Sequence, residues 1–529
     1  MSALVGESGR YPRRWWAFGV LCLSLLVVVL DNTILNVALP TLARDLSASG
    51  SQLQWIVDAY VLVFAGLLLT TGSIGDRFGR KGSLFAGMAV FAAGSCWAAW
   101  SGSADMLIAT RALMGVGGAL MMPPTLSITT NMFDAEERRK AIGMWAGIAG
   151  LGIVLGPLAG GWLLKYFSWG SVFLVNLPII AVALVAGFFL LPESRDPEAT
   201  PLDPVGAVLS VAGLVALLYG IIEVPIHGWT DGKILTSFGL AAILLAGFVG
   251  WELRTTYPML DMRLFRNARF SAASLALALV TFSLFGTLFF LTQYLQLILG
   301  YTALEAGVRF APLAVGLAFG AGISTRLMAR LGAKIPVGMG LLIVAGALAL
   351  LALVRVDSGY GLVAAVVVTL GFGMGNVMPP ATDSIMGALP PAKAGVGSAM
   401  NDTTRQVGGA LGVAVLGSLL SSAYRGAMDG AQATQALPGP IRDLARDSLA
   451  KATAVVGQIG GAPGGALLKA AQEAFVDAMG RSALVAAGVA VLGAVVALAF
   501  LPAHSAETAE TSDATPQPVG ATLPATERG

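Results

Sequence analysis

The feature that most constrains this chain is a succession of long apolar runs, each about the length that crosses a lipid bilayer. About 20 apolar residues span the hydrocarbon core as a helix, and only helices or closed barrels satisfy their backbone groups there. We therefore predict an all-α integral membrane protein in which fourteen runs form transmembrane helices. These runs are 15–38, 52–72, 82–101, 105–129, 140–164, 171–191, 205–224, 233–253, 270–295, 304–327, 336–355, 360–386, 397–421 and 481–502.

The composition supports this fold class and excludes several functions. Charged residues make up 12% of the chain, against about 25% in soluble domains. A net charge of +2 without a basic cluster argues against nucleic-acid binding. The two histidines and two cysteines form no ligand cluster, and no phosphate-binding loop occurs, so we expect no metal, nucleotide or cofactor. The sequence therefore does not predict an enzyme.

One short charged loop orients the helices. Residues 72–81 (GSIGDRFGRK) lie between two apolar runs and carry Asp76, Arg77, Arg80 and Lys81. Glycines there permit a tight turn. Short loops rich in Lys and Arg stay in the cytoplasm, and the distribution of such loops along the chain predicts that both termini are cytoplasmic.

The chain also repeats itself. Residues 115–124 (GVGGALMMPP) correspond to 371–380 (GFGMGNVMPP) at an offset of 256 residues, and 77–81 is echoed by 330–334. Repeated halves with a site between them are typical of secondary transporters. We predict two six-helix halves with two inserted helices. The expected units are a cytoplasmic N-terminus (1–14), the N-terminal half (15–191), a linker (192–204), the inserted helices (205–253), the C-terminal half (254–502) and a disordered cytoplasmic tail (503–529).

A long segment within the C-terminal half, 422–480, is expected to be an extracytoplasmic loop. Its apolar residues are spaced as in short amphipathic helices; these residues are Ile441, Leu444, Leu449, Leu467, Leu468 and Phe475. A partly ordered surface appendage and a gate or partner site remain alternative interpretations.

Three charged residues stand out well inside predicted membrane helices of the N-terminal half. Asp31, Asp58 and Arg111 lie at comparable depths in the first, second and fourth helices. Buried charge in a bilayer is costly and usually functional. Two carboxylates and one guanidinium leave one negative charge uncompensated, which suits a site that exchanges a proton with a cation. The alternative is a buried ion pair that fixes these helices.

Neighbouring residues extend the candidate site. The candidate substrate-binding set is Asp58, Asn32, Asn36, Trp55 and Tyr60. For the asparagines, hydrogen bonding between helices is the alternative. A possible cytoplasmic gate is formed by Asp383, Asp402 and Arg405. In the fifth helix, small residues and a proline predict close packing and a kink that could act as a pivot and seal; they are Gly152, Gly156, Pro157, Gly160 and Gly161.

Together these motifs resemble the fourteen-helix drug:proton antiporters of the major facilitator superfamily. Residues 72–84 resemble the signature loop of the superfamily, 30–40 and 107–119 the motifs of helices 1 and 4, and 152–161 the antiporter motif of exporters. Residues 55–60 (WIVDAY) are similar to the subgroup that exports quaternary-ammonium and other lipophilic cations, in which this aspartate is implicated in cation recognition. The loop 72–81 would then be a cytoplasmic latch built from Gly72, Asp76, Arg77, Gly79, Arg80 and Lys81.

The resemblance implies the major facilitator fold and an inner-membrane exporter driven by the proton gradient. We expect it to move amphipathic cationic or neutral toxic compounds out of the cell by alternating access, with protons and the lipid bilayer as its other partners. Asp31, Asp58 and Arg111 would couple the proton. An exporter dedicated to one endogenous metabolite (an antibiotic, a lipid precursor or a siderophore) is the alternative within this fold. A proton symporter and a non-transporting receptor or scaffold are less favoured.

Overall fold

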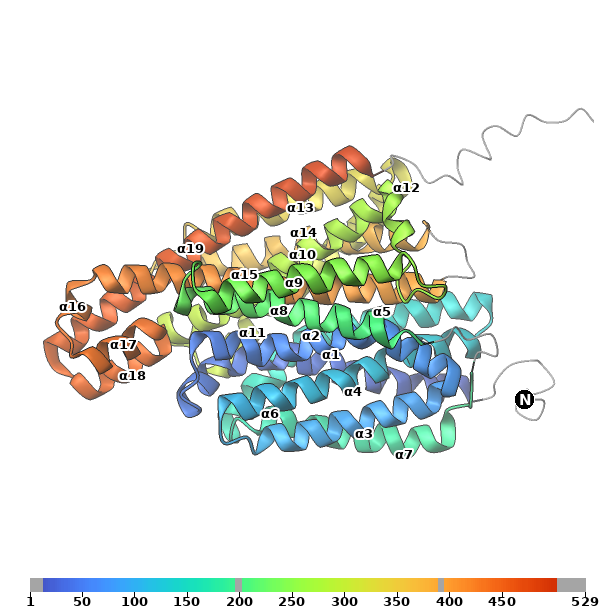
Figure 1. The fold of residues 1–529 in the computed structure, drawn as a ribbon, viewed down its shortest axis with the longest axis horizontal. Coiled ribbons are helices and arrows are strands. Elements are labelled where there is room, and N and C mark those ends of the chain that lie inside the picture. The colour runs from blue at the N-terminus through green and yellow to red at the C-terminus, as the bar shows by residue number, and fades with distance from the viewer. Residues whose placement is uncertain (1–12, 196–201, 389–393, 502–529) are drawn as a thin grey trace, which may run out of the picture.

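The computed structural model describes residues 13–195, 202–388 and 394–501, and within these ranges the protein consists of helices without strands. Long helices run beside one another along the molecule (Figure 1). The first and last described helices have their outer termini at one end, which we call the tail end. The short helices α16, α17 and α18 project from the opposite end, which we call the cap end.

The N-terminal half contains seven helical segments. They are α1 (Arg14–Asp45), α2 (Gly50–Phe78), α3 (Arg80–Ala99), α4 (Ala104–Met132), α5 (Ala135–Tyr166), α6 (Ser171–Leu174) and α7 (Asn176–Leu190). A capping box, in which Ser49 and Gln52 bond each other's backbone N–H groups, starts α2. Gly79, with φ of 117°, allows the chain to turn directly from α2 into α3.

The inserted pair and the C-terminal half follow. The pair is α8 (Pro204–His227) and α9 (Gly232–Glu252). The C-terminal half contains η1 (Met262–Arg266), α10 (Ala268–Gln293), the π-helix η2 (Tyr294–Ile298), α11 (Ala303–Arg309), α12 (Ala311–Leu331), α13 (Lys334–Leu351), α14 (Tyr360–Met386), α15 (Ala394–Gly430), α16 (Gln432–Gln435), α17 (Gly439–Asp447), α18 (Leu449–Ile459) and α19 (Gly461–Phe500).

The predicted fold class is confirmed. Among the described residues, thirteen helices are long and apolar enough to cross a membrane. The 32-residue α5 is a further long helix at the position of the fifth predicted span. Two predicted spans are interrupted, 171–191 near Val175 and 304–327 near Phe310. Pro178 and Pro312 each follow a break by two or three residues, and proline removes the N–H that would bond the preceding turn.

Apolar side chains form two cores, one in each half. The first draws mainly on α1 to α7, and the second mainly on α10 to α19. The α8–α9 hairpin lies over the seam where α2 of one half meets α15 of the other, as Figure 1 allows the reader to follow. Gly66 of α2 faces the side chain of Val211, and the Ser418 hydroxyl of α15 donates to the Ile221 carbonyl at 2.7 Å.

The segment 422–480 is more helical than predicted. Helix α15 has 37 residues and α19 has 40, so α19 is about 60 Å long, twice a hydrocarbon core of about 30 Å. Both helices extend beyond their apolar runs, because the alanine-rich sequence that follows or precedes each run favours helix. Leu449, Leu467 and Phe475 are buried in the resulting cap, whereas Leu444 is 48% exposed. The predicted N-terminal and C-terminal tails fall almost wholly on residues outside the described ranges.

Candidate functional site

A buried ion pair between α1 and α4 lies at the centre of the N-terminal half. Both Asp31 and Arg111 are 0% exposed, and Arg111 Nη1 lies 2.5 Å from Asp31 Oδ2. The Asn176 amide, from α7, donates to Asp31 Oδ1 at 3.0 Å. Both carboxylate oxygens are therefore bonded, which compensates the cost of burying this charge.

Arg111 makes two further contacts that explain its fixed position. Its Nε donates to the Ile56 carbonyl of α2 at 3.1 Å, and its guanidinium lies over the Tyr60 ring, 4.4 Å from the centroid. A guanidinium over an aromatic face is attracted by the ring quadrupole. Arg111 thus joins α1, α2 and α4 in one network.

Asp58 lies elsewhere, although it was predicted beside this pair. Asp58 is 0% exposed, and neither carboxylate oxygen has a hydrogen-bond partner among the described residues. Its neighbours one turn away on α2 are Gln54, which contacts Gly417 of α15, and Leu62. Residues four apart share a helix face, so Asp58 lies on the face of α2 that meets the other half.

An apolar cavity continues this seam beyond Asp58. It has a volume of about 200 Å³ and is lined by α2, α8 and α15 through Leu62, Ala65, Leu214, Leu218, Val407, Ala410 and Leu411. Tyr60, two positions after Asp58, faces Arg111 instead. An α-helix has about 3.6 residues per turn, so side chains two positions apart point in nearly opposite directions. The three predicted charges therefore occupy two places: a bonded pair inside one half and a lone carboxylate between the halves.

The other predicted substrate-binding residues lie on α1 and α2, the helices that carry Asp31 and Asp58. Asn36 Nδ2 donates to the Asn32 carbonyl at 3.4 Å, and the side-chain oxygens of both asparagines are buried with no partner in the part of the chain described. Trp55 packs on Tyr219 of the inserted helix α8, with centroids 6.4 Å apart. The Tyr60 hydroxyl is likewise buried and unbonded within the described ranges.

The glycine-rich stretch of α5 contacts both halves. Gly152, Gly156 and Gly160 pack against α1; a Cβ on Gly160 would lie 2.8 Å from Ile34 Cγ1. A Cβ on Gly161 would lie 2.6 Å from the Ala303 carbonyl oxygen of α11, in the other half. Only glycine allows such close backbone approach.

A second contact joins the halves on the same side. The Gln296 amide donates to the Val37 carbonyl of α1 at 2.9 Å. Together with the contact between Gly307 and Pro157, it lies in the part of the bundle toward the cap end, where α5 finishes and α11 begins. The halves therefore meet closely at the cap end.

The side chains of the predicted latch loop bond within the N-terminal half, and its Arg80 N–H donates to the Ser194 carbonyl of the linker at 2.9 Å. Arg80 Nε donates to Asp76 Oδ1 at 2.7 Å, and Lys81 Nζ donates to the Phe188 and Leu191 carbonyls at 2.9 and 3.0 Å. Lys81 thereby satisfies carbonyls at the end of α7, where a cation is favoured. Gly72 packs on Pro123 of α4, and Arg77 lies over the exposed ring of Phe78.

The predicted gate residues lie at the tail end of the C-terminal half. Arg269 Nη2 is 3.9 Å from Asp383 Oδ2, and Arg405 Nη1 is 3.7 Å from Asp402 Oδ1. These pairs connect α10 with α14 and one turn of α15 with itself. In this conformation both pairs lie within one half.

Sequence reasoning missed a carboxyl pair at the base of the inserted hairpin. Glu252 is 3% exposed and accepts from the Leu260 N–H at 2.9 Å. Asp203 accepts from the Trp251 indole N–H at 2.9 Å and from the Gly206 N–H at 2.8 Å. A Cβ on Gly206 would lie 2.6 Å from an oxygen of each carboxyl group, so the two face one another. Acidic residues at both ends of a predicted two-helix insertion were the available signal.

Within the described ranges, no group of three or more His, Cys, Asp or Glu side chains is placed to hold a metal. What the arrangement offers is one compensated ion pair, one buried lone carboxylate and a seam between two halves.

Comparison with known proteins adds the family. The sequence profile of the Major Facilitator Superfamily matches residues 21–413. The multidrug efflux pump LfrA of Mycolicibacterium smegmatis is 38% identical over 491 residues, which are 92% of this chain and 96% of the relative. The tetracenomycin C resistance and export protein of Streptomyces glaucescens is 35% identical over 93% of this chain and 92% of its own length.

A solved structure shares the fold. A bacterial homologue of the human lysosomal transporter Spinster, crystallised in an inward-facing and unoccupied conformation, matches with a TM-score of 0.64 and 20% identity. The match covers 93% of this chain and 99% of that one.

Proposed function

Because this chain belongs to the Major Facilitator Superfamily and is a transporter rather than an enzyme, we propose that it exports amphipathic cationic and neutral toxic compounds in exchange for protons. Its relatives carry the names of a multidrug efflux pump and of a methyl viologen resistance protein, and methyl viologen is an organic dication. The observation that carries the proposal is Asp58, a fully buried carboxylate for which the described chain provides no hydrogen-bond partner.

A lone carboxylate in an apolar seam must be neutralised. Burying it ionised without a partner is costly, and the cost disappears when the group binds a proton or a lipophilic cation. The two ligands cannot occupy one carboxylate together. Competition at Asp58 therefore supplies the exchange on which antiport depends, provided that the site opens alternately to each side.

The position of Asp58 suits alternating access. It lies on the α2 face that meets α15, so movement of one half against the other changes its exposure. The adjacent cavity lined by Leu62 and Ala65 is apolar, which favours contact with the hydrophobic part of a substrate when the halves separate.

The Asp31–Arg111 pair has a supporting role in this proposal. Both oxygens of Asp31 are already bonded, by Arg111 and Asn176. A proton from outside would have to displace Arg111 before Asp31 could bind it. We therefore assign exchange to Asp58 and assign to the pair the positioning of α1, α2 and α4, in which Arg111 also fixes Tyr60 on the face of α2 opposite Asp58.

We propose that the tail end faces the cytoplasm and that the protein lies in the cytoplasmic membrane with both termini inside. The Arg- and Lys-rich loop 72–81 and the charges around Asp383 lie at this end, in keeping with the positive-inside rule. The close α5–α11 contact then seals the outer side in this conformation, and loop 72–81 would latch the halves when the inner side closes.

The test uses inside-out vesicles that hold an acidic interior. Adding ethidium or tetraphenylphosphonium should dissipate the pH gradient in the wild type. This dissipation should be lost in Asp58→Asn and retained in Asp477→Asn, which changes an exposed carboxylate of α19 in the same way. Asp31→Asn should lower the amount of folded protein more than the exchange per molecule.

Retained exchange in Asp58→Asn would refute the assignment to that residue and return attention to Asp31. One observation favours a second candidate function, an exporter dedicated to one compound: the tetracenomycin C relative is itself named for export of a single antibiotic. A substrate panel on the purified protein separates the two functions, since a dedicated exporter would respond to one chemical class alone.

A further inference from the structure

A second cavity lies at the cap end, apart from Asp58. Its empty space, part of which is open to solvent, is about 380 Å³, and it is bounded by α2, α10, α15, α19 and the junction between α17 and α18. Leu53, Phe289, Leu420 and Phe475 supply apolar walls, and Asp447 and Ser448 at the α17–α18 junction close it on the cap side. Its lining combines apolar walls with a few polar groups, as in small-molecule sites.

One buried polar group points to a ligand. Gln54 is 1% exposed and lines the cavity, and its Oε1 has no hydrogen-bond partner within the described ranges. Gln54 is held against Gly417, where a Cβ would lie 2.8 Å from the Gln54 amide carbon. A buried acceptor left unbonded costs free energy, and a ligand that donates a hydrogen bond would remove that cost.

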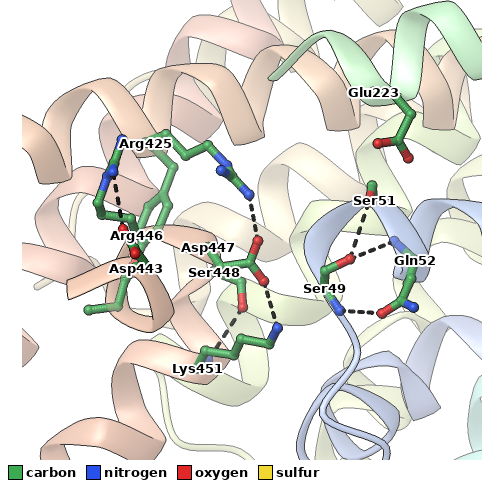
Figure 2. Close-up of polar contacts among 12 residues, drawn as sticks. Ser49, Ser51, Gln52, Glu223, Arg425, Asp443, Arg446, Asp447, Ser448 and Lys451 are labelled. Carbon is green, nitrogen blue, oxygen red and sulfur yellow. Dashed lines mark hydrogen bonds and ion pairs between the residues drawn. The ribbon is translucent and has the colours of Figure 1, made fainter. Parts of the chain in front are cut away.

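The charges beside the cavity are already paired, which sets the ligand's charge. Asp447 is 2.5 Å from Arg425 Nη2 and 2.8 Å from Lys451 Nζ, and Figure 2 shows both cations directed at this one carboxylate. Two other acids are labelled in the same view: Asp443, which lies 3.4 Å from Arg446 Nη1, and Glu223, which lies 3.6 Å from His227 Nδ1. A cation here would meet Arg425 and Lys451, whereas an uncharged molecule would meet no opposing charge.

The cap takes part in this site. The Tyr424 hydroxyl donates to the Ala445 carbonyl at 3.0 Å and ties α17 to α15. Gly50, at the start of α2, lies so that a Cβ would be 3.6 Å from the Asp447 carbonyl oxygen. The wall at Asp447 and Ser448 is therefore bonded to α15 and lies against the start of α2, over the end of the α2–α15 seam.

We propose that this cavity is a second ligand site, which holds an uncharged amphipathic molecule through a hydrogen bond donated to Gln54 Oε1. The role of this site rests on the proposed export function: the site would hold neutral substrates as they leave along the α2–α15 seam. The binding itself depends on Gln54, the apolar walls and the cap.

The experiment measures direct binding to the full chain in nanodiscs. Tritiated chloramphenicol is the uncharged probe, because it is small, carries an aromatic ring and donates N–H and O–H hydrogen bonds; tritiated tetraphenylphosphonium is the cationic probe. We expect both to bind together. Gln54→Leu should weaken chloramphenicol binding about tenfold, the effect of losing one buried hydrogen bond, and should leave the cation unaffected.

Controls separate the two sites. Gln458→Leu makes the same change at an exposed position of α18 and should bind both probes normally. Ser421→Leu fills the cavity and should abolish chloramphenicol binding while cation binding reports an intact fold. Asp58→Asn should weaken the cation and spare chloramphenicol.

The site is refuted if chloramphenicol fails to bind the wild type, binds Gln54→Leu and Gln458→Leu equally, or is displaced by tetraphenylphosphonium. Failure of the proposed function looks different: proton exchange would persist in Asp58→Asn, whatever the dependence of chloramphenicol on Gln54.

Discussion

Removing Arg111 should destabilise the protein mainly because the buried carboxylate of Asp31 would lose its cationic partner. Arg111→Met keeps an unbranched apolar stem but removes the guanidinium, which leaves Asp31, 0% exposed in the wild type, with only Asn176 as a partner. Breaking a buried pair on one side costs about 3–5 kcal/mol. The lost bond to Ile56 and the lost contact with the Tyr60 ring belong to the same network, so we expect a total near 4 kcal/mol.

A second substitution, Asp31→Asn, tests whether the unpaired charge of Asp31 causes this loss of stability. Asp31→Asn in the Arg111→Met background removes the unpaired charge and leaves a smaller polar group beside Asn176. The double variant should therefore be more stable than Arg111→Met by roughly 2–3 kcal/mol, a coupling expected only of residues in direct contact. Conversion of both partners removes the penalty that either single change creates.

The assay is reversible unfolding in mixed micelles by titration with sodium dodecyl sulfate, followed by helical circular dichroism for the wild type, both single variants and the double variant. Trp97→Phe, an exposed change on α3, serves as the control for a stability effect unrelated to the pair. If the two single losses add to the double loss within about 0.5 kcal/mol, the pair is not coupled and the reasoning is refuted.

Three further changes test other parts of the structure. Gly161→Val should separate α5 from α11 and abolish transport without loss of fold, and normal export rates would contradict the tight contact with Ala303. Trp251→Phe removes the indole donor to Asp203 and should cost about 1–2 kcal/mol in thermal unfolding; an unchanged midpoint would show that the carboxyl pair does not depend on it. Asp447→Asn should speed hydrogen exchange in α17 and α18 while α13 stays protected, because Arg425 and Lys451 lose their shared carboxylate; equal protection in the variant would argue against the cap being held by these ion pairs.

The sequence by itself determined the fold class and most of the helices. Runs of about 20 apolar residues have one solution in a bilayer, so helix positions follow from length and hydropathy alone. The repeat between 115–124 and 371–380 and the charged loop 72–81 carried the two-half architecture in the same way. Because burying a charge in a membrane is costly, the sequence also identified Asp31, Asp58 and Arg111 as residues whose burial requires a functional or structural explanation.

Only the tertiary structure decided how those residues are grouped. Depth along a helix can be read from sequence, but the direction a side chain faces depends on which helix packs on which side. Asp31 therefore bonds both Arg111 and Asn176, which come from helices that no local pattern connects with α1. Asp58 lies instead on the face of α2 that carries Gln54 and meets α15. The helical structure of residues 422–480 could not be predicted for a related reason. These helices are stabilised by burial of Leu449, Leu467 and Phe475 in the core of the C-terminal half. Hydropathy indicates burial in the membrane and does not report contacts between helices.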